Sequence, residues 1–157
     1  MCKKPKGFTL IEMLIVITII ALLASIILVG MGSARAKARD SRRIADLHNV
    51  QNALELYFSK NGKYPTATNW DDLITDLTNA DIGINQIPKD PLNNTTYIYR
   101  YGADDAGTDY VLGAQLEQCD NALNSDIDDA SIYGINCSDQ NTNCKTSDTY
   151  KIYCIKP

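Results

Sequence analysis

The chain has 157 residues, of which 45% are hydrophobic and 22% are charged, and its formal net charge is −4. This length allows one ordinary domain with an appendage, and the apolar content is higher than that of a disordered chain. Because the chain has a single histidine, His48, a histidine-based catalytic site or a multi-histidine metal site is excluded.

The charge is divided unevenly along the chain. Residues 1–63 hold ten Lys and Arg against four Asp and Glu, whereas residues 64–157 hold five against fifteen. The second part is therefore an acidic head. Since an acidic surface repels the phosphates of nucleic acids, we expect no direct binding of DNA or RNA by the head.

The first predicted element is an apolar helix. Residues 13–31 carry no charge, and only Thr18, Ser25 and Gly30 interrupt the apolar run. At ~1.5 Å per residue this helix is about 29 Å long, close to a hydrocarbon core of ~30 Å. The pattern predicts a membrane-spanning helix. The small residues that follow it also resemble a signal-peptide cleavage site, but a more specific signal lies upstream.

That signal is Lys6-Gly7-Phe8-Thr9-Leu10-Ile11-Glu12, in which a short basic leader ends in Gly before Phe8 and an apolar run with one Glu. It resembles the class III signal of type IV pilins. The similarity continues to Tyr64-Pro65, a stem ending typical of pilins and of type II secretion pseudopilins. The resemblance implies cleavage between Gly7 and Phe8 by a prepilin peptidase, N-methylation of Phe8 and polymerisation into a filament.

Glu12 is a carboxylate at the edge of the apolar run. Such a group is rare in a membrane span and generally marks function. Its position near the end of the span also fits an interfacial carboxylate that reaches the lipid headgroups. The resemblance to pilins implies an assembly role instead, in which Glu12 neutralises the α-amino group of Phe8 in an adjacent subunit.

Beyond Gly32 the chain becomes an amphipathic helix. Its apolar positions recur at steps of three and four: Ile44, Leu47, Val50, Leu54, Tyr57 and Phe58. No proline interrupts residues 6–64, so we expect one helix from about residue 8 to about residue 60.

The basic cluster Arg35–Arg43 has three possible interpretations. It is a solvated collar, a contact with the acidic heads of neighbouring subunits, or a nucleic-acid-binding surface. The third is disfavoured because the cluster has no aromatic residues interleaved with its basic ones.

The acidic head is predicted to contain one short helix and three strands. Trp70, Leu73, Ile74 and Leu77 form an apolar stripe, with Asn69 or Thr68 as N-cap. Alternating segments at 97–101 and 110–116 predict a hairpin, and 150–155 predicts a third strand. The expected fold class is α+β: a long N-terminal helix, with a membrane-spanning half and an amphipathic half, packed on a small antiparallel β-sheet head, as in pilins.

The five cysteines indicate in which cellular compartment the head lies. Cys2 lies in the leader, and the head keeps an even set of four without a Cys-x-x-Cys pair, which makes zinc improbable. Of the three possible pairings we predict two disulfides, Cys119–Cys144 and Cys137–Cys154, because antiparallel strands two and three would place Cys119 near Cys144. Disulfides place the head outside the cytoplasm, whereas the positive charges flanking the apolar run, counted alone, favour the opposite orientation.

Acidic loops at 104–105 and 124–129 are the remaining candidates for a ligand. Their composition is compatible with calcium, but neither fits the twelve-residue loop with a Gly and a terminal Glu. We therefore interpret them as solvated acids and expect no metal and no cofactor. The head offers no nucleophile–base pair and no phosphate loop, so we expect no enzymatic activity.

These observations predict four segments: a leader peptide (1–7), a transmembrane or filament-core helix (8–32), an amphipathic stem helix (33–63) and a disulfide-bonded head (64–157). The expected function is the structural subunit of an extracellular type IV pilus, made as a single-pass precursor in the inner membrane. Expected partners are identical subunits, the prepilin peptidase and the inner-membrane assembly platform with its ATPase. The alternatives are a pseudopilin of a type II secretion or competence filament, and a monomeric membrane protein with a ligand-binding head.

Overall fold

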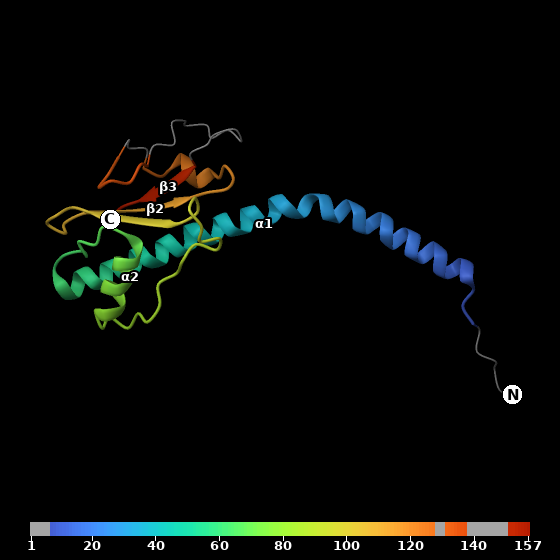
Figure 1. The fold of residues 1–157 in the computed structure, drawn as a ribbon, viewed down its shortest axis with the longest axis horizontal. Coiled ribbons are helices and arrows are strands. Elements are labelled where there is room, and N and C mark those ends of the chain that lie inside the picture. The colour runs from blue at the N-terminus through green and yellow to red at the C-terminus, as the bar shows by residue number, and fades with distance from the viewer. Residues whose placement is uncertain (1–6, 128–130, 138–150) are drawn as a thin grey trace. The chain divides into compact units, whose positions relative to one another are not determined.

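The computed structural model describes residues 7–127, 131–137 and 151–157, without the side chains of residues 26–30. Its elements, in chain order, are α1 (Leu10–Asn61), α2 (Trp70–Asn79), β1 (Tyr99–Ala103), β2 (Tyr110–Gln115), the 3-10 helix η1 (Asn121–Asn124) and β3 (Ile152–Ile155), as Figure 1 shows. The chain divides into two compact units, which we call the N-terminal unit (Met1–Ala36) and the head unit (Lys37–Pro157).

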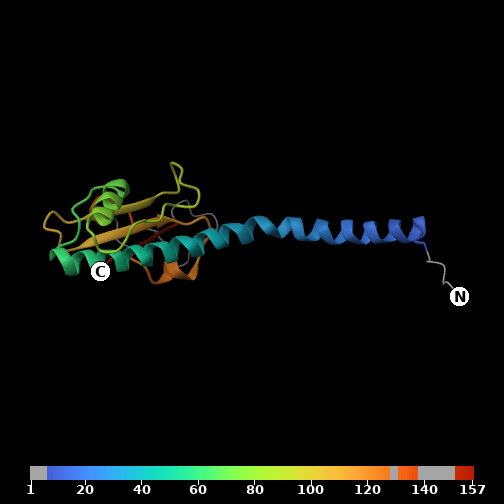
Figure 2. The same ribbon diagram turned by 90° about the horizontal axis from the view of Figure 1, so that it is seen from below.

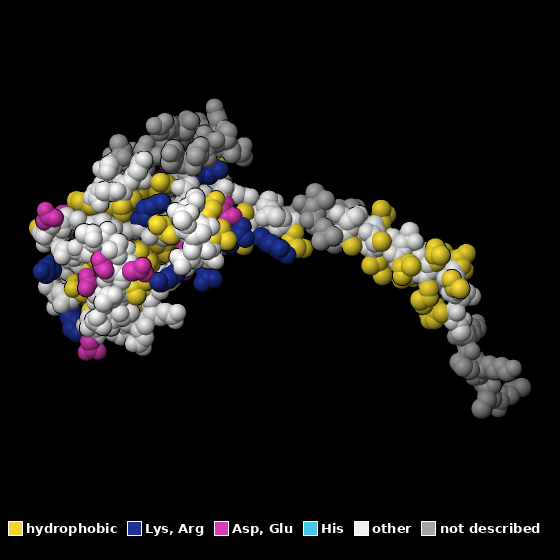
Figure 3. All heavy atoms as spheres, in the orientation of Figure 1, with side chains coloured by type: hydrophobic (Ala, Val, Ile, Leu, Met, Phe, Trp, Pro, Cys, Tyr) yellow, Lys and Arg dark blue, Asp and Glu magenta, His cyan; other side chains and the backbone are white. Residues whose placement is uncertain are grey.

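In the described part of the N-terminal unit, α1 is an apolar helix whose side chains are exposed to solvent along most of its length. All side chains from residue 8 to residue 25 are exposed, and hydrophobic side chains cover this part of α1 in Figure 3. Exposed apolar surface of this extent is typical of a segment that lipid or another protein chain covers. Among the described residues, no helix has both the length and the apolarity needed to cross a membrane.

The head unit is built on the C-terminal part of α1. Leu47, Val50 and Leu54 are at most 1% exposed, because steps of three and four put them on one face of the helix. Figure 2 shows this part of α1 running along the strands. Of the predicted stripe, Ile44 and Tyr57 are only partly buried, and Phe58 is 38% exposed although its ring packs on Tyr64.

The three described strands form an antiparallel sheet in the order β1-β2-β3. Arg100 of β1 lies opposite Gly113 of β2, and Gly113 in turn lies opposite Cys154 of β3. Tyr110, Leu112 and Ala114 of β2 belong to the main core with α1. Val111 faces the other side of the sheet, where a second cluster contains Ile135, Cys137, Ile152 and Cys154. Both faces of the sheet are therefore covered by apolar residues.

The expected α+β, pilin-like arrangement is confirmed, with shifts at element ends. Helix α2 has Asn69 as its N-cap, whose side chain accepts a hydrogen bond from the backbone of Asp72. The first strand begins at Tyr99 and runs to Ala103, two residues later than expected at each end. The reason is local: the amide oxygen of Asn94 accepts hydrogen bonds from the backbone N–H of Thr96 and of Tyr97, which holds these residues in a turn. Helix η1 was not expected from the sequence.

Candidate processing and assembly site

The predicted processing junction lies in a non-helical segment in front of α1. Gly7 and Phe8 precede the first helical residue, Leu10. Phe8 is 78% exposed, and among the described residues no heavy atom beyond the chain neighbours of Gly7 lies within 4 Å of a Cβ built on that glycine. A peptide bond in such an open, non-helical segment is accessible to a protease. Cleavage there and methylation of Phe8 remain predictions.

Glu12 forms a capping box with Thr9 at the start of α1. Its carboxylate accepts hydrogen bonds from the backbone N–H of Thr9 at 2.8 Å and from the Thr9 hydroxyl at 2.7 Å. In return, the Glu12 backbone N–H donates to the Thr9 hydroxyl at 3.3 Å. The spacing Thr-x-x-Glu before an apolar run is the sequence signature of this motif, so the cap was predictable from Thr9 and Glu12. The carboxylate is directed to the helix N-terminus, the end that carries Phe8.

The basic cluster Arg35–Arg43 is not a uniform collar. Arg43 is completely buried, and its guanidinium donates to Asp90 at 2.6 and 3.1 Å, to Asp40 at 2.7 Å and to Glu117 at 2.7 Å. Arg39 donates two hydrogen bonds to Glu117, one to each carboxylate oxygen. Arg35, Lys37 and Arg42 are exposed. For Arg43, which is completely buried, the solvated collar and the contact with neighbouring heads are therefore both wrong. Arg39, which is partly exposed, contacts a glutamate of its own head.

We call Arg39, Asp40, Arg43, Asp90 and Glu117 the arginine cluster. It ties α1 to two loops of the head, because Asp40 also accepts hydrogen bonds from the backbone N–H groups of Glu117 and Gln118, both at 2.9 Å. The ring of Tyr97 lies 4.8 Å from the Arg43 guanidinium carbon. In sequence, Asp40 and Arg43 continue the buried stripe of Leu47 at helical steps, which is the signal for their inward position.

Hydrogen bonding decides the ionisation of this cluster. The contact with Arg39 holds the pKa of Glu117 well below its usual 4.5, at about 2; burial opposes this shift, and Arg43 adds to it. Burial alone would lower the pKa of Arg43, but its hydrogen bonds to Asp90, Glu117 and Asp40 raise the pKa above its usual value. Arg43 and Glu117 are therefore both charged at neutral pH.

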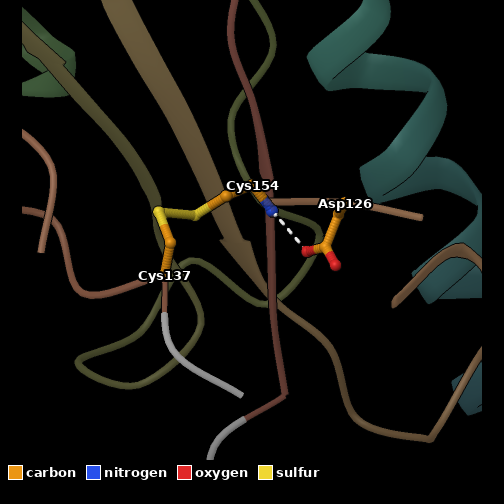
Figure 4. The surroundings of a disulfide bond; sticks show 3 residues. All are labelled: Asp126, Cys137 and Cys154. Atoms are coloured by element: carbon orange, nitrogen blue, oxygen red, sulfur yellow. Dashed lines mark hydrogen bonds between the residues drawn. A yellow bond between two sulfur atoms is a disulfide. The ribbon is translucent and has the colours of Figure 1, made fainter. Parts of the chain in front are cut away.

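A disulfide joins Cys137 and Cys154, one of the two pairs expected, with their Cα atoms 5.8 Å apart. The backbone N–H of Cys154 also donates to the carboxylate of Asp126 at 2.9 Å, as Figure 4 shows. These contacts fix the 131–137 segment and the loop that follows η1 to β3. Cys119 is disulfide-bonded as well, and its expected partner, Cys144, lies outside the described residues.

The acidic loops have structural roles where the structure describes them. Asp104 closes the β1–β2 hairpin, because its carboxylate accepts hydrogen bonds from the backbone N–H groups of Thr108 at 2.6 Å and Asp109 at 2.9 Å. Within residues 7–127, 131–137 and 151–157, no three His, Cys, Asp or Glu side chains are grouped to hold a metal ion. Asp128 and Asp129 of the second loop lie outside the described residues.

Comparison with known proteins gives concordant results for both ends of the chain. Residues 2–28 match the family model "Prokaryotic N-terminal methylation motif", and residues 31–130 match "Type II secretion system (T2SS), protein G". No solved structure matches the chain significantly.

Three curated relatives illustrate the similarity. The type II secretion system core protein G of Vibrio cholerae is 31% identical over 134 residues, which cover 80% of this chain and 91% of the relative. The protein of the same name from Escherichia coli is 34% identical over 110 residues, 69% of this chain and 72% of the relative. The type IV wide pilus major component PilA4 of Thermus thermophilus is 42% identical over 62 residues, 40% of this chain and 47% of the relative.

Proposed function

Because the chain belongs to the type II secretion system protein G family of structural pilins and pseudopilins, we propose that it is the structural subunit of a cell-surface filament of the type IV pilin class. The observation that carries the proposal is the apolar part of α1. Its side chains are exposed along the described length, the Gly7–Phe8 junction lies directly in front of it, and Glu12 sits in its first turn. An exposed apolar helix of this kind is suited to packing against the helices of other subunits, and it is not part of the core of the head.

The proposed course of assembly follows from the segments of the chain. The precursor is held in the inner membrane by residues 8–32, and the prepilin peptidase removes residues 1–7. The head lies outside the cytoplasm, which agrees with the Cys137–Cys154 disulfide because such bonds persist in oxidising compartments. The assembly platform and its ATPase then transfer the subunit into a filament of identical copies, where neighbouring helices take the place of lipid.

Two filaments fit this role. One is the extracellular type IV pilus that the N-terminal motif predicts. The other is the pseudopilus of a type II secretion system, and the extent of similarity favours it: the core protein G of V. cholerae aligns with 80% of the chain, whereas the T. thermophilus pilin aligns with 40%. A monomeric membrane protein does not account for the processing motif at Gly7 and Phe8.

Deletion of the gene distinguishes the two filaments. Electron microscopy would count surface fibres on wild-type, deleted and complemented cells, and an assay of the culture medium would measure secreted proteins in the same strains. Loss of abundant fibres with normal secretion identifies a pilus subunit. Loss of secretion identifies a pseudopilin. If fibres and secretion are both unchanged, the proposed function is wrong.

A further inference from the structure

The head unit contains a cavity of about 460 Å³ beside β1. β1 is an edge strand of the described sheet, since β2 separates it from β3. Arg100 lines the cavity together with Trp70, Ile98 and Tyr133. Neither the arginine cluster nor the disulfide accounts for this hollow, and the proposed filament function assigns it no role.

Arg100 has no partner for its charge among the described residues. Its Nη1 atom is buried and makes no hydrogen bond, and no hydrogen bond or ion pair joins its guanidinium to another described side chain. Arg43, in contrast, satisfies its guanidinium with three carboxylates. A buried donor without an acceptor is unfavourable for a fold and needs an explanation. Burial also lowers the pKa of Arg100, as expected for a cation that lacks an anionic neighbour.

The walls of the cavity are held in place by the protein itself. The Trp70 indole N–H donates to the carbonyl of Pro88 at 3.0 Å, and its ring packs edge-on against Tyr99. On the other side, the Tyr133 hydroxyl donates to Asp109 at 2.9 Å. The cavity is therefore preformed, and binding of a ligand would require little further ordering of these side chains.

Tyr133 occupies a position that local structure does not favour. It begins a two-residue turn between Ile132 and Ile135, which pair with each other, and its φ is 46°. Asn and Gly are the usual residues for such a turn, and a bulky side chain at positive φ is strained. The turn also presses on β1 where only glycine fits, since a Cβ on Gly102 would lie 2.6 Å from the Tyr133 carbonyl oxygen. Strain that the fold maintains in this way is a mark of functional sites.

We propose that this cavity binds an acidic side chain of an extended peptide segment from a partner protein. The Arg100 guanidinium is a fork that matches a carboxylate, and Trp70, Ile98 and Tyr133 offer an apolar wall for the neighbouring residues of the peptide. No described strand pairs with the outer edge of β1, so this edge can pair with the backbone of an extended chain. Asp71 and Asp90 also line the cavity, but each already has a cationic partner, Lys89 and Arg43 respectively. One carboxylate therefore matches the charge that Arg100 leaves over, and a multiply charged anion such as a phosphate is disfavoured.

The single tryptophan of the chain reports on this cavity. We would titrate the purified full-length protein in detergent micelles with a capped five-residue peptide, Thr-Val-Glu-Val-Thr, and record the tryptophan emission. The matched probe replaces Glu by Gln. We expect a saturable change with the Glu peptide and binding weaker by about tenfold or more with the Gln peptide. Equal affinities, or no saturable change, would overturn the proposal.

Variants test the role of Arg100 directly. Arg100→Leu should weaken binding of the Glu peptide by about tenfold or more, and Arg100→Lys, which keeps the charge without the fork, should bind with intermediate affinity. The control variant is Lys156→Gln, which also removes one positive charge but at an exposed position. It should bind the Glu peptide as tightly as the wild type does. Arg100→Leu should not lower Tm, since no described residue is its partner. A lower Tm, unchanged binding, or stronger displacement by inorganic phosphate than by acetate would overturn the proposal.

Discussion

Arg43 and Asp90 are 47 residues apart in the chain, yet the Arg43 Nε atom donates to Asp90 Oδ2 at 2.6 Å with both side chains withdrawn from solvent. This pair fixes the C-terminal part of α1 to the segment that leads into β1. Because Asp40 and Glu117 bind the same guanidinium, one side chain connects the helix to two separate loops of the head.

The first prediction concerns that guanidinium. Arg43→Met leaves the buried carboxylates of Asp40 and Asp90 without their cation, and breaking a buried pair in this way costs about 3–5 kcal/mol of unfolding free energy. The adjacent Arg42 is the matched control: its side chain is 64% exposed, and among the described residues its one ion pair is with Asp46, at 3.5 Å. Arg42→Met should therefore change stability by less than about 1 kcal/mol. Denaturant titration of the full-length protein measures both. Equal effects would show that the arginine cluster does not hold the head to α1.

The second prediction is a loss of stability in acid. The pKa of Glu117 is about 2 in the folded protein against a usual 4.5, so the folded state binds fewer protons than the unfolded state between these values. Stability from Glu117 is therefore complete above about pH 4.5 and declines as the pH falls toward about 2. Unfolding free energies measured at several pH values in this window should show a shallower decline for Glu117→Gln than for the wild type. Identical slopes would contradict the assignment.

The third prediction concerns the disulfide between Cys137 and Cys154. The bond closes a loop of 17 residues, for which loop-closure entropy gives about 3 kcal/mol. Replacing both cysteines by Ala should lower the unfolding free energy by about that amount, because the apolar cluster around them is retained. Peptide mapping without reductant should also recover Cys119 joined to Cys144. Cys119 joined to Cys137 would contradict both pairs.

Regular patterns made most of the fold predictable from the sequence. The steps of three and four in α1, the Asn69 cap of α2 and the alternation in β2 are local signals, and each predicted an element that the structure contains. The cavity beside β1 was not predictable, because it depends on the Tyr133 turn. A Tyr-Gly turn lacks the usual Asn-Gly signature, and its contact with Gly102 joins segments about 30 residues apart.

The arginine cluster was missed for a different reason. Arg43 stands in a basic run with Arg39 and Arg42, and a count of charges does not tell which of them faces inward. The phase of the helix does: Asp40 and Arg43 precede Leu47 by seven and four residues and lie on its buried face. Their partners Asp90 and Glu117 come from loops, where no periodic pattern marks a partner.

The fourth prediction concerns the N-terminus of the mature chain. It should begin at methylated Phe8, because the Gly7–Phe8 junction lies in an open segment before α1. Removal of residues 1–7 leaves 12 Lys and Arg against 19 Asp and Glu, a net charge of −7. Mass spectrometry of filaments sheared from the cell surface measures this directly. Retention of Met1 or Cys2 in that material would rule out processing at Gly7.

The fifth prediction separates two roles of Glu12. In the structure Glu12 caps α1 with Thr9, and a glutamine at this position also completes a capping box. Glu12→Gln therefore keeps the cap but cannot neutralise the α-amino group of Phe8 in an adjacent subunit. Both Glu12→Gln and Glu12→Leu should insert in the membrane and be cleaved after Gly7, yet assemble poorly. Glu12→Asp, which keeps the charge, should retain part of the activity.

The most direct test of the filament function is a count of filaments by electron microscopy on cells that carry wild-type Glu12, Glu12→Gln or Glu12→Leu, with subunit levels and cleavage checked by immunoblot. If neutralisation of the neighbouring amine sets the register of assembly, both variants accumulate as cleaved membrane subunits and form few or no filaments. Filaments of normal length and number from Glu12→Leu would contradict the account and leave Glu12 as an interfacial carboxylate.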